Sequence, residues 1–390
     1  MSERSPPLRG PARRLVVTNP FVWPYVRRGS ERLVNDLSAY LAQRGHEVSV
    51  FASAPDAMVE KRGDVTYHLL RERLGRRPRQ INSLHSYAWR LPRPLADADA
   101  DAVFCLNYFD AWAALRARQR LGARHRVIFQ VVGLPSRRYF RAVPLDAWFM
   151  HTALHAADRV VAVSRFAADM LASEFGVRAE VLPVPVVMRE FEATAPLVSA
   201  AADAPVLLFV GDADQPRKGA ALLCRAFVQV RARLPGARLV FSGQASATTV
   251  ARLLAMPGLA SVRNSVEFRG LGAIDELPAL YRAASVTVLP AVFEALGMAL
   301  IESLASGTPV VAARHGGAMD VVVGPLVGQL FDPGPGVEQS ENEAGLVAAI
   351  IDTVSRGKPD SVRRACVDRA RLFSWDMLGP RYEALLVNAP

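Results

Sequence analysis

The sequence predicts an α/β protein with two doubly wound domains, each built around a parallel sheet. Strand-like runs alternate with helix-like runs along the chain, and the alternation is interrupted near residues 182–205. The 390 residues suffice for two domains of ordinary size, and a hydrophobic content of 51% supplies two sizeable cores. We therefore expect an N-terminal domain over residues 1–190 and a second domain from residue 191 onward.

The first domain opens as strand, helix, strand. Residues 15–17 form a β-rich run, and apolar residues then recur at helical spacing over 33–41, behind Ser30 as the predicted N-cap and before Gly45 as the stop. Residues 46–51 form the next strand. Because a βαβ unit joins parallel strands, this sheet should be parallel. Further strands are predicted at 102–106, 126–132 and 159–163, the last leading into a helix from Arg165.

Proline-punctuated residues 182–186 and 193–205 have the character of a linker. The strands predicted after it are 206–210, 238–241, 266–268, 286–289 and 309–312, and the clearest amphipathic helix covers 222–230. In α/β folds ligands bind at the carboxyl ends of the strands. We therefore expect the two domains to face a shared cleft at those ends.

Composition excludes several classes of protein. Cys105, Cys224 and Cys366 are too few and too widely spaced for a disulfide framework or a zinc site, so they are expected in the cores. The net charge is +10, and 44 of the 47 basic residues are arginine, since Lys61, Lys218 and Lys358 are the only lysines. No nucleic-acid-binding motif accompanies this charge.

The arginines concentrate in one segment, which is either a solvated loop or a contact with a lipid or anionic acceptor. Its members are Arg71, Arg73, Arg76, Arg77 and Arg79, followed by Arg90 and Arg93. The sequence has neither the apolar core of a signal peptide nor an apolar run of bilayer length. We expect a cytoplasmic protein, with the arginine-rich segment as a candidate contact with the inner face of the membrane.

Residues 293–311 carry the most informative pattern. A strand ending at Leu289 leads to a loop that holds Glu294, and a helix starting near Gly297 carries Glu302. The amides of Gly297, Met298 and Ala299 would lie at the positive end of that helix, which suits a diphosphate. Glu302 could accept hydrogen bonds from a ribose diol, and Glu294 could contact a sugar beyond the phosphates. The alternative is that both glutamates lie on the surface of an ordinary helix.

With its neighbours, this segment resembles the family-4 glycosyltransferases of the GT-B fold. Their signature is two glutamates separated by seven residues and followed by Gly-Thr-Pro-Val-Val, here 307–311. Similar matches occur along most of the chain, at 29–32, 44–48, 158–164, 216–219, 315–317 and 373–375. The resemblance implies a donor domain ending at 371 and a final helix over 372–390 that crosses back to the first domain.

The resemblance also implies an enzyme that transfers a sugar from a nucleotide-diphosphate donor, UDP- or GDP-linked, with retention at the anomeric carbon. The implied catalytic residues are Glu294, Lys218 and Arg217, of which the two cations would stabilise the leaving diphosphate. The implied donor-binding residues are Gly29, Lys218, Gly243, Gly270, Leu271, Glu294, Leu296, Gly297, Met298, Ala299 and Glu302. The resemblance implies no obligatory metal cofactor.

The acceptor is expected to contact the first domain, and its class stays open between a glycan, a lipid-linked molecule and a natural product. Loops over 71–94 and 133–146, rich in arginine and aromatic residues, are where acceptor contacts are expected. The candidate acceptor-side residues are Gln130, Arg137, Arg138 and Tyr139.

Departures from the family pattern leave alternatives open. Asp212 stands where the family carries an arginine, and Gln130 or Val132 stands where a first-domain histidine is usual. The main alternative is therefore a catalytically silent nucleotide-binding scaffold or activator. An epimerase of the same architecture is a third, for which no acid/base pair is identified.

Paired acidic or histidine residues raise the question of a metal. Asp212 and Asp214 either hold a divalent cation that bridges to the diphosphate or pair with Arg217 and Lys218. The run Asp97-Ala98-Asp99-Ala100-Asp101 precedes its strand and is expected to be a solvated loop or helix end. His151 and His155 have metal-ligand spacing without an evident third ligand, so packing or helix capping is expected there.

Overall fold

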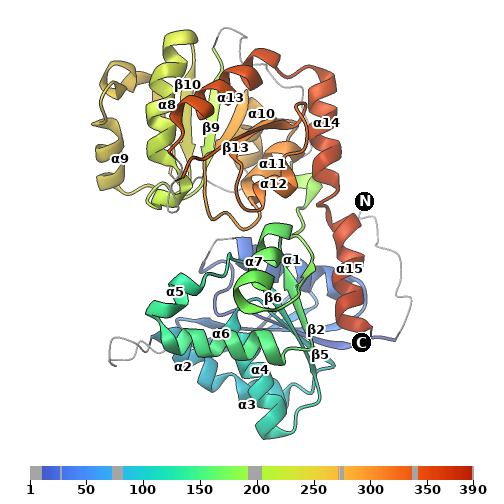
Figure 1. The fold of residues 1–390 in the computed structure, drawn as a ribbon. Coiled ribbons are helices and arrows are strands. Elements are labelled where there is room, and N and C mark those ends of the chain that lie inside the picture. Colours follow the sequence, from blue (N-terminus) through green and yellow to red (C-terminus); the bar gives the residue numbers. More distant parts are fainter. Residues whose placement is uncertain are drawn as a thin grey trace. The chain divides into compact units, whose positions relative to one another are not determined.

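The computed structural model describes residues 11–26, 29–72, 82–191, 204–270, 272, 276–335 and 341–388. The chain divides into two compact units (Figure 1): unit 1 contains Met1–Val184 and Leu378–Pro390, and unit 2 contains Pro185–Met377. The sequence analysis divided the chain at 190 and 371 instead. Among the described residues, no helix has both the length and the apolar character needed to cross a bilayer.

Unit 1 is built on an eight-stranded sheet in the order β3-β4-β2-β1-β5-β6-β7-β8, in which only the β3–β4 pair is antiparallel. Its strands are β1 (Arg14–Thr18), β2 (Glu47–Ala54), β3 (Met58–Arg62), β4 (Val65–Arg71), β5 (Ala102–Cys105), β6 (Arg126–Val131), β7 (Arg159–Ala162) and β8 (Glu180–Val181). Its helices are α1 (Gly29–Gln43), α2 (Ser83–Arg90), α3 (Pro92–Asp97), α4 (Tyr108–Leu121), α5 (Arg137–Ala142), α6 (Pro144–Ala156), α7 (Arg165–Phe175) and most of α15 (Trp375–Val387).

Unit 2 is built on a six-stranded parallel sheet in the order β11-β10-β9-β12-β13-β14. Its strands are β9 (Val206–Val210), β10 (Arg238–Ser242), β11 (Val266–Phe268), β12 (Val286–Leu289), β13 (Val310–Ala313) and β14 (Gly328–Phe331). Its α-helices are α8 (Ala220–Arg233), α9 (Ala247–Leu254), α10 (Leu277–Ala283), α11 (Met298–Ala305), α12 (Ala318–Val321), α13 (Glu343–Arg356) and α14 (Asp360–Arg371), with short 3₁₀ helices η1 (Met188–Glu190), η2 (Pro216–Lys218) and η3 (Leu259–Ser265).

Burial explains why the inner strands form where the sequence predicts them. All four residues of β5, β12 and β13 are buried, as expected of central parallel strands covered by helices on both faces. In unit 1 the helices contribute a packed aromatic cluster, in which the Phe149 ring centroid lies 4.8 Å from that of Trp112 and 5.0 Å from that of Phe109. The three cysteines are buried.

The structure corrects the sequence analysis at several elements. Helix α1 begins at Gly29, so Ser30 is its second residue and not its cap. The β3–β4 hairpin, β8 and β14 were not predicted. Strand β3 is mostly exposed and lacks an apolar face, and β8 has only two residues, so neither leaves a clear pattern. Strand β4 does alternate buried and half-buried residues, a period-2 signal that was available.

The helix α15 joins unit 1 through specific contacts. The Arg44 Nε donates to Glu383 Oε2 at 3.0 Å, and the Arg126 Nη1 donates to the Asn388 carbonyl at 2.5 Å. These bonds tie the end of the chain to the region after α1 and to β6. Residues from Leu378 onward therefore belong to the same compact unit as the N-terminal half.

Candidate functional site

In unit 2 the chain order reverses at β9, which pairs with β10 on one side and β12 on the other. Ligands of doubly wound sheets bind at such a switch point, outside the carboxyl ends of the strands. The loop after β9 carries Arg217 and Lys218, and the loop after β12 carries Glu294. The Val292 amide donates to the Arg217 carbonyl at 2.9 Å, so the two loops are in direct contact.

The charged side chains of these loops meet. Lys218 Nζ forms an ion pair and hydrogen bond with Glu294 Oε2, and Arg217 Nη1 lies 3.8 Å from the same oxygen. Arg217 Nη1 also donates to the Phe293 carbonyl at 3.0 Å. The Arg217 side chain remains 40% exposed, whereas Lys218 and Glu294 are each 16% exposed. Two cations against one carboxylate leave a net positive charge at the end of the switch-point strands.

Helix α11 begins beside this cluster. Its cap, Gly297, has φ +88°, a conformation that L side chains rarely adopt, and a side chain there would crowd Leu300. The Leu300 amide donates a hydrogen bond to the Gly297 carbonyl at 2.9 Å. Helix geometry leaves the first amides, those of Met298 and Ala299, without an acceptor inside the helix. They are half-buried and lie at the positive end of the helix dipole, next to a loop with excess positive charge.

A glycine turn supports the backbone at Glu294. The Gly317 amide donates to the Glu294 carbonyl at 2.9 Å, and a Cβ on Gly316 would lie 2.1 Å from that same oxygen. Only glycine fits so close to the chain. The preceding His315 accepts a hydrogen bond at Nδ1 from the Phe293 amide at 3.2 Å, and Phe293 has a positive φ of 55°. His315 and Phe293 were not among the predicted site residues. The sequence offered one signal for them, which is that His315 directly precedes the matched glycines and Phe293 directly precedes Glu294.

Glu302 lies deeper than the sequence analysis placed it. The residue is buried, with an exposed fraction of 8%, and its Oε2 accepts a hydrogen bond from the Tyr281 hydroxyl at 2.8 Å. The interpretation of Glu302 as a surface residue is therefore wrong, while its contact with a ribose stays a prediction. Tyr281, which comes from α10, was missed because only the packing of α10 against α11 brings the two side chains together.

Glycines at the ends of β9, β10 and β11 also converge. The Gly243 amide donates to the Gly270 carbonyl at 2.8 Å, and a Cβ on Gly243 would lie 2.1 Å from the Gly211 carbonyl oxygen. The chain at Gly243 therefore packs directly against Gly211, and a side chain at Gly243 would not fit. Leu271, predicted to be near the nucleobase, lies outside the described residues, and Leu296 is buried before α11. The donor roles of Gly243 and Gly270 stay predictions.

Asp212 and Asp214 do not pair with Arg217 and Lys218, which corrects that alternative. Asp212 accepts hydrogen bonds from the Asp214 amide at 3.0 Å and from Gln215 Nε2 at 2.7 Å. Asp214 accepts from the Ser246 amide and hydroxyl at the start of α9. Hydrogen bonds from Thr249 and Ser246 lower the pKa of Asp214 to about 2. Asp212 is thus held by donors of its own loop, and Asp214 by donors at the start of α9.

The other acidic and histidine patterns have structural partners. Asp101 Oδ2 accepts from the Arg14 amide at 2.8 Å, and Asp99 pairs with the Arg14 side chain, at the amino end of the strands. The rings of His151 and His155 pack with centroids 4.3 Å apart. Within the described ranges, no group of three or more histidine, cysteine, aspartate and glutamate side chains is arranged to hold a metal ion.

In unit 1 the structure removes one acceptor candidate. Gln130 is completely buried, and its Nε2 donates to the Leu182 carbonyl at 2.8 Å and to the Tyr382 hydroxyl at 2.9 Å. It therefore anchors α15 and cannot face an acceptor in this unit. Arg137, Arg138 and Tyr139 lie on α5 with exposed side chains, so their role stays a prediction. Gly29 begins α1 and is likewise exposed.

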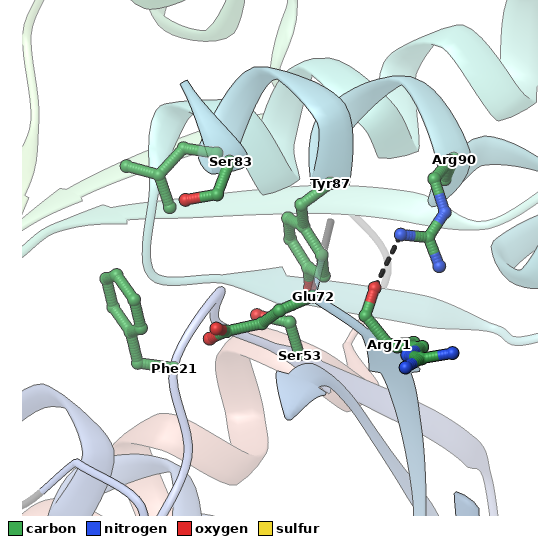
Figure 2. Close-up of a pocket in the computed structure, with 8 residues that line it drawn as sticks. Phe21, Ser53, Arg71, Glu72, Ser83, Tyr87 and Arg90 are labelled. Atoms are coloured by element: carbon green, nitrogen blue, oxygen red, sulfur yellow. Dashed lines mark hydrogen bonds between the residues drawn. The ribbon is translucent and has the colours of Figure 1, made fainter. Parts of the chain in front are cut away.

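Unit 1 has its own hollow at the carboxyl ends of β2 and β4. Figure 2 shows the residues that line it: Phe21, Ser53, Arg71, Glu72, Ser83, Leu84, Tyr87 and Arg90. Several belong to the segment 71–94, in which acceptor contacts were expected. Of the arginine-rich segment, Arg73, Arg76, Arg77 and Arg79 lie outside the described residues.

Comparison with known sequences decides the family. Residues 27–187 match the model of a family described as Glycosyltransferase Family 4, and residues 204–355 match one described as Glycosyl transferases group 1. The chain belongs to the family-4 glycosyltransferases. The second match contains the Lys218–Glu294 cluster and the start of α11.

Curated relatives of this family-4 member include D-inositol 3-phosphate glycosyltransferases. That of Acidothermus cellulolyticus is 35% identical over 182 residues, which cover 45% of this chain and 39% of the relative. That of Mycolicibacterium smegmatis is 31% identical over 176 residues, which cover 44% of this chain and 38% of the relative. The match thus spans less than half the length of either relative.

Solved structures confirm the GT-B fold of this family-4 member. A sucrose-phosphate synthase from Thermosynechococcus elongatus matches 96% of this chain and 98% of its own with a TM-score of 0.76 at 20% identity. Anabaena HepE, solved in complex with UDP and glucose, matches 96% of this chain and 99% of its own with a TM-score of 0.72 at 17% identity. At these identities the likeness shows the fold alone.

Proposed function

We propose that this family-4 member is a retaining glycosyltransferase that moves a sugar from a nucleotide-diphosphate donor to an acceptor hydroxyl. The observation that carries the proposal is the meeting of Lys218, Arg217 and Glu294 with the start of α11 at the switch point of unit 2. Cations, helix amides and a carboxylate in one place suit a ligand with a diphosphate at one end and a sugar at the other.

The proposed chemistry follows from the charge that the donor develops. When the bond between the anomeric carbon and the diphosphate breaks, the departing phosphate oxygen gains negative charge. Lys218, Arg217 and the amides of Met298 and Ala299 are fixed dipoles and charges that would stabilise it. A new bond to the acceptor oxygen forms on the same face of the sugar, and the acceptor hydroxyl gives its proton to the departing phosphate oxygen. Glu294 holds Lys218 in place and offers its carboxylate to hydroxyls of the transferred sugar.

For the donor nucleotide we propose uridine diphosphate ahead of guanosine diphosphate. The support is the HepE structure, which carries UDP and glucose on the same fold. For the acceptor, the names of the curated relatives point to a hydroxylated ring. No metal is required in this proposal, because Asp212 accepts hydrogen bonds within its own loop and Asp214 accepts them from Ser246 at the start of α9.

The test is calorimetric binding of UDP-, GDP- and dTDP-sugars to the wild type and to Glu302→Ala, with and without Mn²⁺. Selective binding that Glu302→Ala weakens would support the proposal. Glu343→Ala is the matched control in unit 2, because Glu343 pairs with Arg225 at 3.0 Å at the start of α13. Absence of binding across the panel would overturn the proposal, and a protein partner would then be sought.

A further inference from the structure

Lys358 lies in the short connection between α13 and α14, and the proposed chemistry gives it no role. It is one of only three lysines in the chain. Its Nζ donates to the Arg282 carbonyl at 2.8 Å, to the Ala284 carbonyl at 2.7 Å and to Thr308 Oγ1 at 2.8 Å. An ammonium group has three N–H donors, so these three bonds use all of them.

The three acceptors belong to two parts of unit 2. Arg282 lies in the last turn of α10 and Ala284 is the cap that ends this helix, where carbonyls lack partners inside the helix. A lysine near a helix C-terminus is a favourable partner for such carbonyls. Thr308 comes just before β13 and is completely buried. Lys358 therefore joins the end of α10 to the start of β13.

Two further hydrogen bonds lead from Thr308 to Glu302. Thr308 Oγ1, which accepts from Lys358, donates to the Tyr281 carbonyl at 2.7 Å. The Tyr281 hydroxyl then donates to Glu302 Oε2 at 2.8 Å. Thr308 and Tyr281 are both completely buried, so these bonds are shielded from water. The place of the Tyr281 backbone decides where its hydroxyl meets the carboxylate in α11.

Lys358 does not lie at the edge of the sheet where the donor cluster lies. Ala284 and Thr308 precede β12 and β13, so their lysine partner lies at the amino ends of these strands. Lys218 and Glu294 meet at the carboxyl end of β12. Any influence of Lys358 on a donor must therefore pass through other residues.

The ammonium is surrounded by neutral acceptors, and α14 contributes the titratable groups that act on it. Burial, together with the positive charge of Arg363, lowers the pKa of Lys358 to about 8. Arg363 pairs with Asp360 at 2.5 Å. Burial raises the pKa of the nearby Cys366 thiol to about 12, so this thiol is uncharged where Lys358 titrates. A neutral amine keeps only two N–H donors, so deprotonation releases one of the three bonds.

We propose that Lys358 is a positioning residue for the donor site, which holds the Glu302 carboxylate in its binding orientation through Thr308 and Tyr281. The inference rests on the proposed function, since it adds a remote support to the donor site of that glycosyltransferase. The support is specific, because each bond of the chain from Lys358 to Glu302 has one donor and one acceptor at 2.7–2.8 Å.

The experiment measures by calorimetry the affinity for the tightest binder among UDP-, GDP- and dTDP-glucose. Lys358→Met keeps the length of the side chain and removes its three donors, and Thr308→Val removes only the linking hydroxyl. The control is Val362→Ala, which removes apolar contacts of a buried residue on α14 that is no member of the hydrogen-bonded chain. Denaturant unfolding measures the stability of each variant.

We expect Lys358→Met to weaken donor binding by about fivefold or more, and Thr308→Val to act in the same direction. Val362→Ala should lose stability and keep the donor affinity of the wild type. The Tyr281→Phe background shows the route: because the Tyr281 hydroxyl is already lost there, Lys358→Met should change donor affinity by less than about twofold.

The pH profile is a second readout, which general destabilisation would not reproduce. The pKa of Lys358 is lowered to about 8 from its ordinary value of 10.5, so the unfolded chain binds this proton more tightly. The contribution of this group to folding stability therefore rises with pH between those two values. Donor affinity should nevertheless fall as the ammonium is lost, so the ratio of wild-type to Lys358→Met affinity should shrink toward one between about pH 7 and about pH 9.5.

Equal donor affinity in the wild type and Lys358→Met, an equal loss in Val362→Ala, additive losses in the Tyr281→Phe background or a constant affinity ratio across the pH range would each overturn the inference. If Lys358→Met does not fold, Thr308→Val and its double variant with Tyr281→Phe decide in its place. Absence of donor binding in the wild type would refute the proposed function and the inference with it. Intact wild-type binding with any of the other outcomes would refute the inference alone.

Discussion

Lys218 and Glu294 form an ion pair although 76 positions separate them in the sequence. One follows β9 and the other follows β12, and these strands are neighbours in the sheet of unit 2. The pair therefore marks the switch point, where the fold brings a basic loop and an acidic loop together. It also holds the ammonium next to the start of α11, where a diphosphate would need it.

Replacement of Lys218 should affect turnover more than folding. We expect Lys218→Ala to lower kcat by about tenfold or more, equivalent to ~1.4 kcal/mol of transition-state stabilisation, because one of the cations facing the leaving group is lost. Steady-state kinetics with the donor identified by calorimetry measures this. The control is Lys61→Ala, an exposed lysine on β3. Equal kcat in wild type and Lys218→Ala would show that the cluster is not the catalytic site.

Tyr281 should position Glu302. Its buried hydroxyl donates to Glu302 Oε2 at 2.8 Å, so Tyr281→Phe leaves the carboxylate without this donor. We expect donor affinity to fall several-fold, with about 1–2 kcal/mol lost from the free energy of unfolding. Calorimetry and denaturant unfolding measure the two effects.

The matched control is Tyr382→Phe, which removes an equally buried hydroxyl that is bonded to Gln130 in unit 1. It should cost comparable stability and leave donor affinity unchanged. If both variants changed donor affinity equally, Tyr281 would act through general stability and not through Glu302.

The backbone next to Glu294 should respond to acid. Partial burial lowers the pKa of His315 from its ordinary value of 6.5, and its Nδ1 must be unprotonated to accept from the Phe293 amide. The folded protein thus binds this proton less readily than the unfolded chain. The associated stability is complete above pH 6.5 and is lost as the pH falls through the lowered pKa.

We therefore expect UDP-glucose affinity and unfolding temperature to fall as the pH drops below about 6.5. His315→Asn keeps an acceptor near the Nδ1 position and removes the titration. Its pH profile should be flatter over that range in calorimetry and thermal unfolding. An identical profile for the variant would remove His315 as the cause.

Asp214 should act as a structural cap and not as a metal ligand. Hydrogen bonds from Thr249 and Ser246 lower its pKa to about 2, so its stabilising effect is present above the ordinary carboxyl value and is lost as the pH falls toward 2. We expect Asp214→Ala to lower the unfolding temperature at pH 7, and EDTA or Mn²⁺ to leave donor affinity unchanged. Tighter donor binding with Mn²⁺ in the wild type, but not in Asp214→Ala, would contradict this expectation.

The predictable part of the site was local in sequence. A continuous apolar run such as residues 286–289 predicts a buried strand, and a glycine before an apolar helical pattern predicts where α11 begins. The spacing of Glu294 and Glu302 and the matched glycines then indicated the family. Each of these signals depends on residues that are close together along the chain.

The sequence by itself determined the two α/β units, the positions of their inner strands and the family to which the chain belongs. Only the tertiary structure decided that Gln130 is buried against Tyr382, that Glu302 is bonded to Tyr281 and that Glu72 lines a hollow with α2. The physical reason is that a periodic pattern reports which face of an element is buried. The partner that covers that face depends on the order of strands and helices in space, which brings together residues far apart in the sequence.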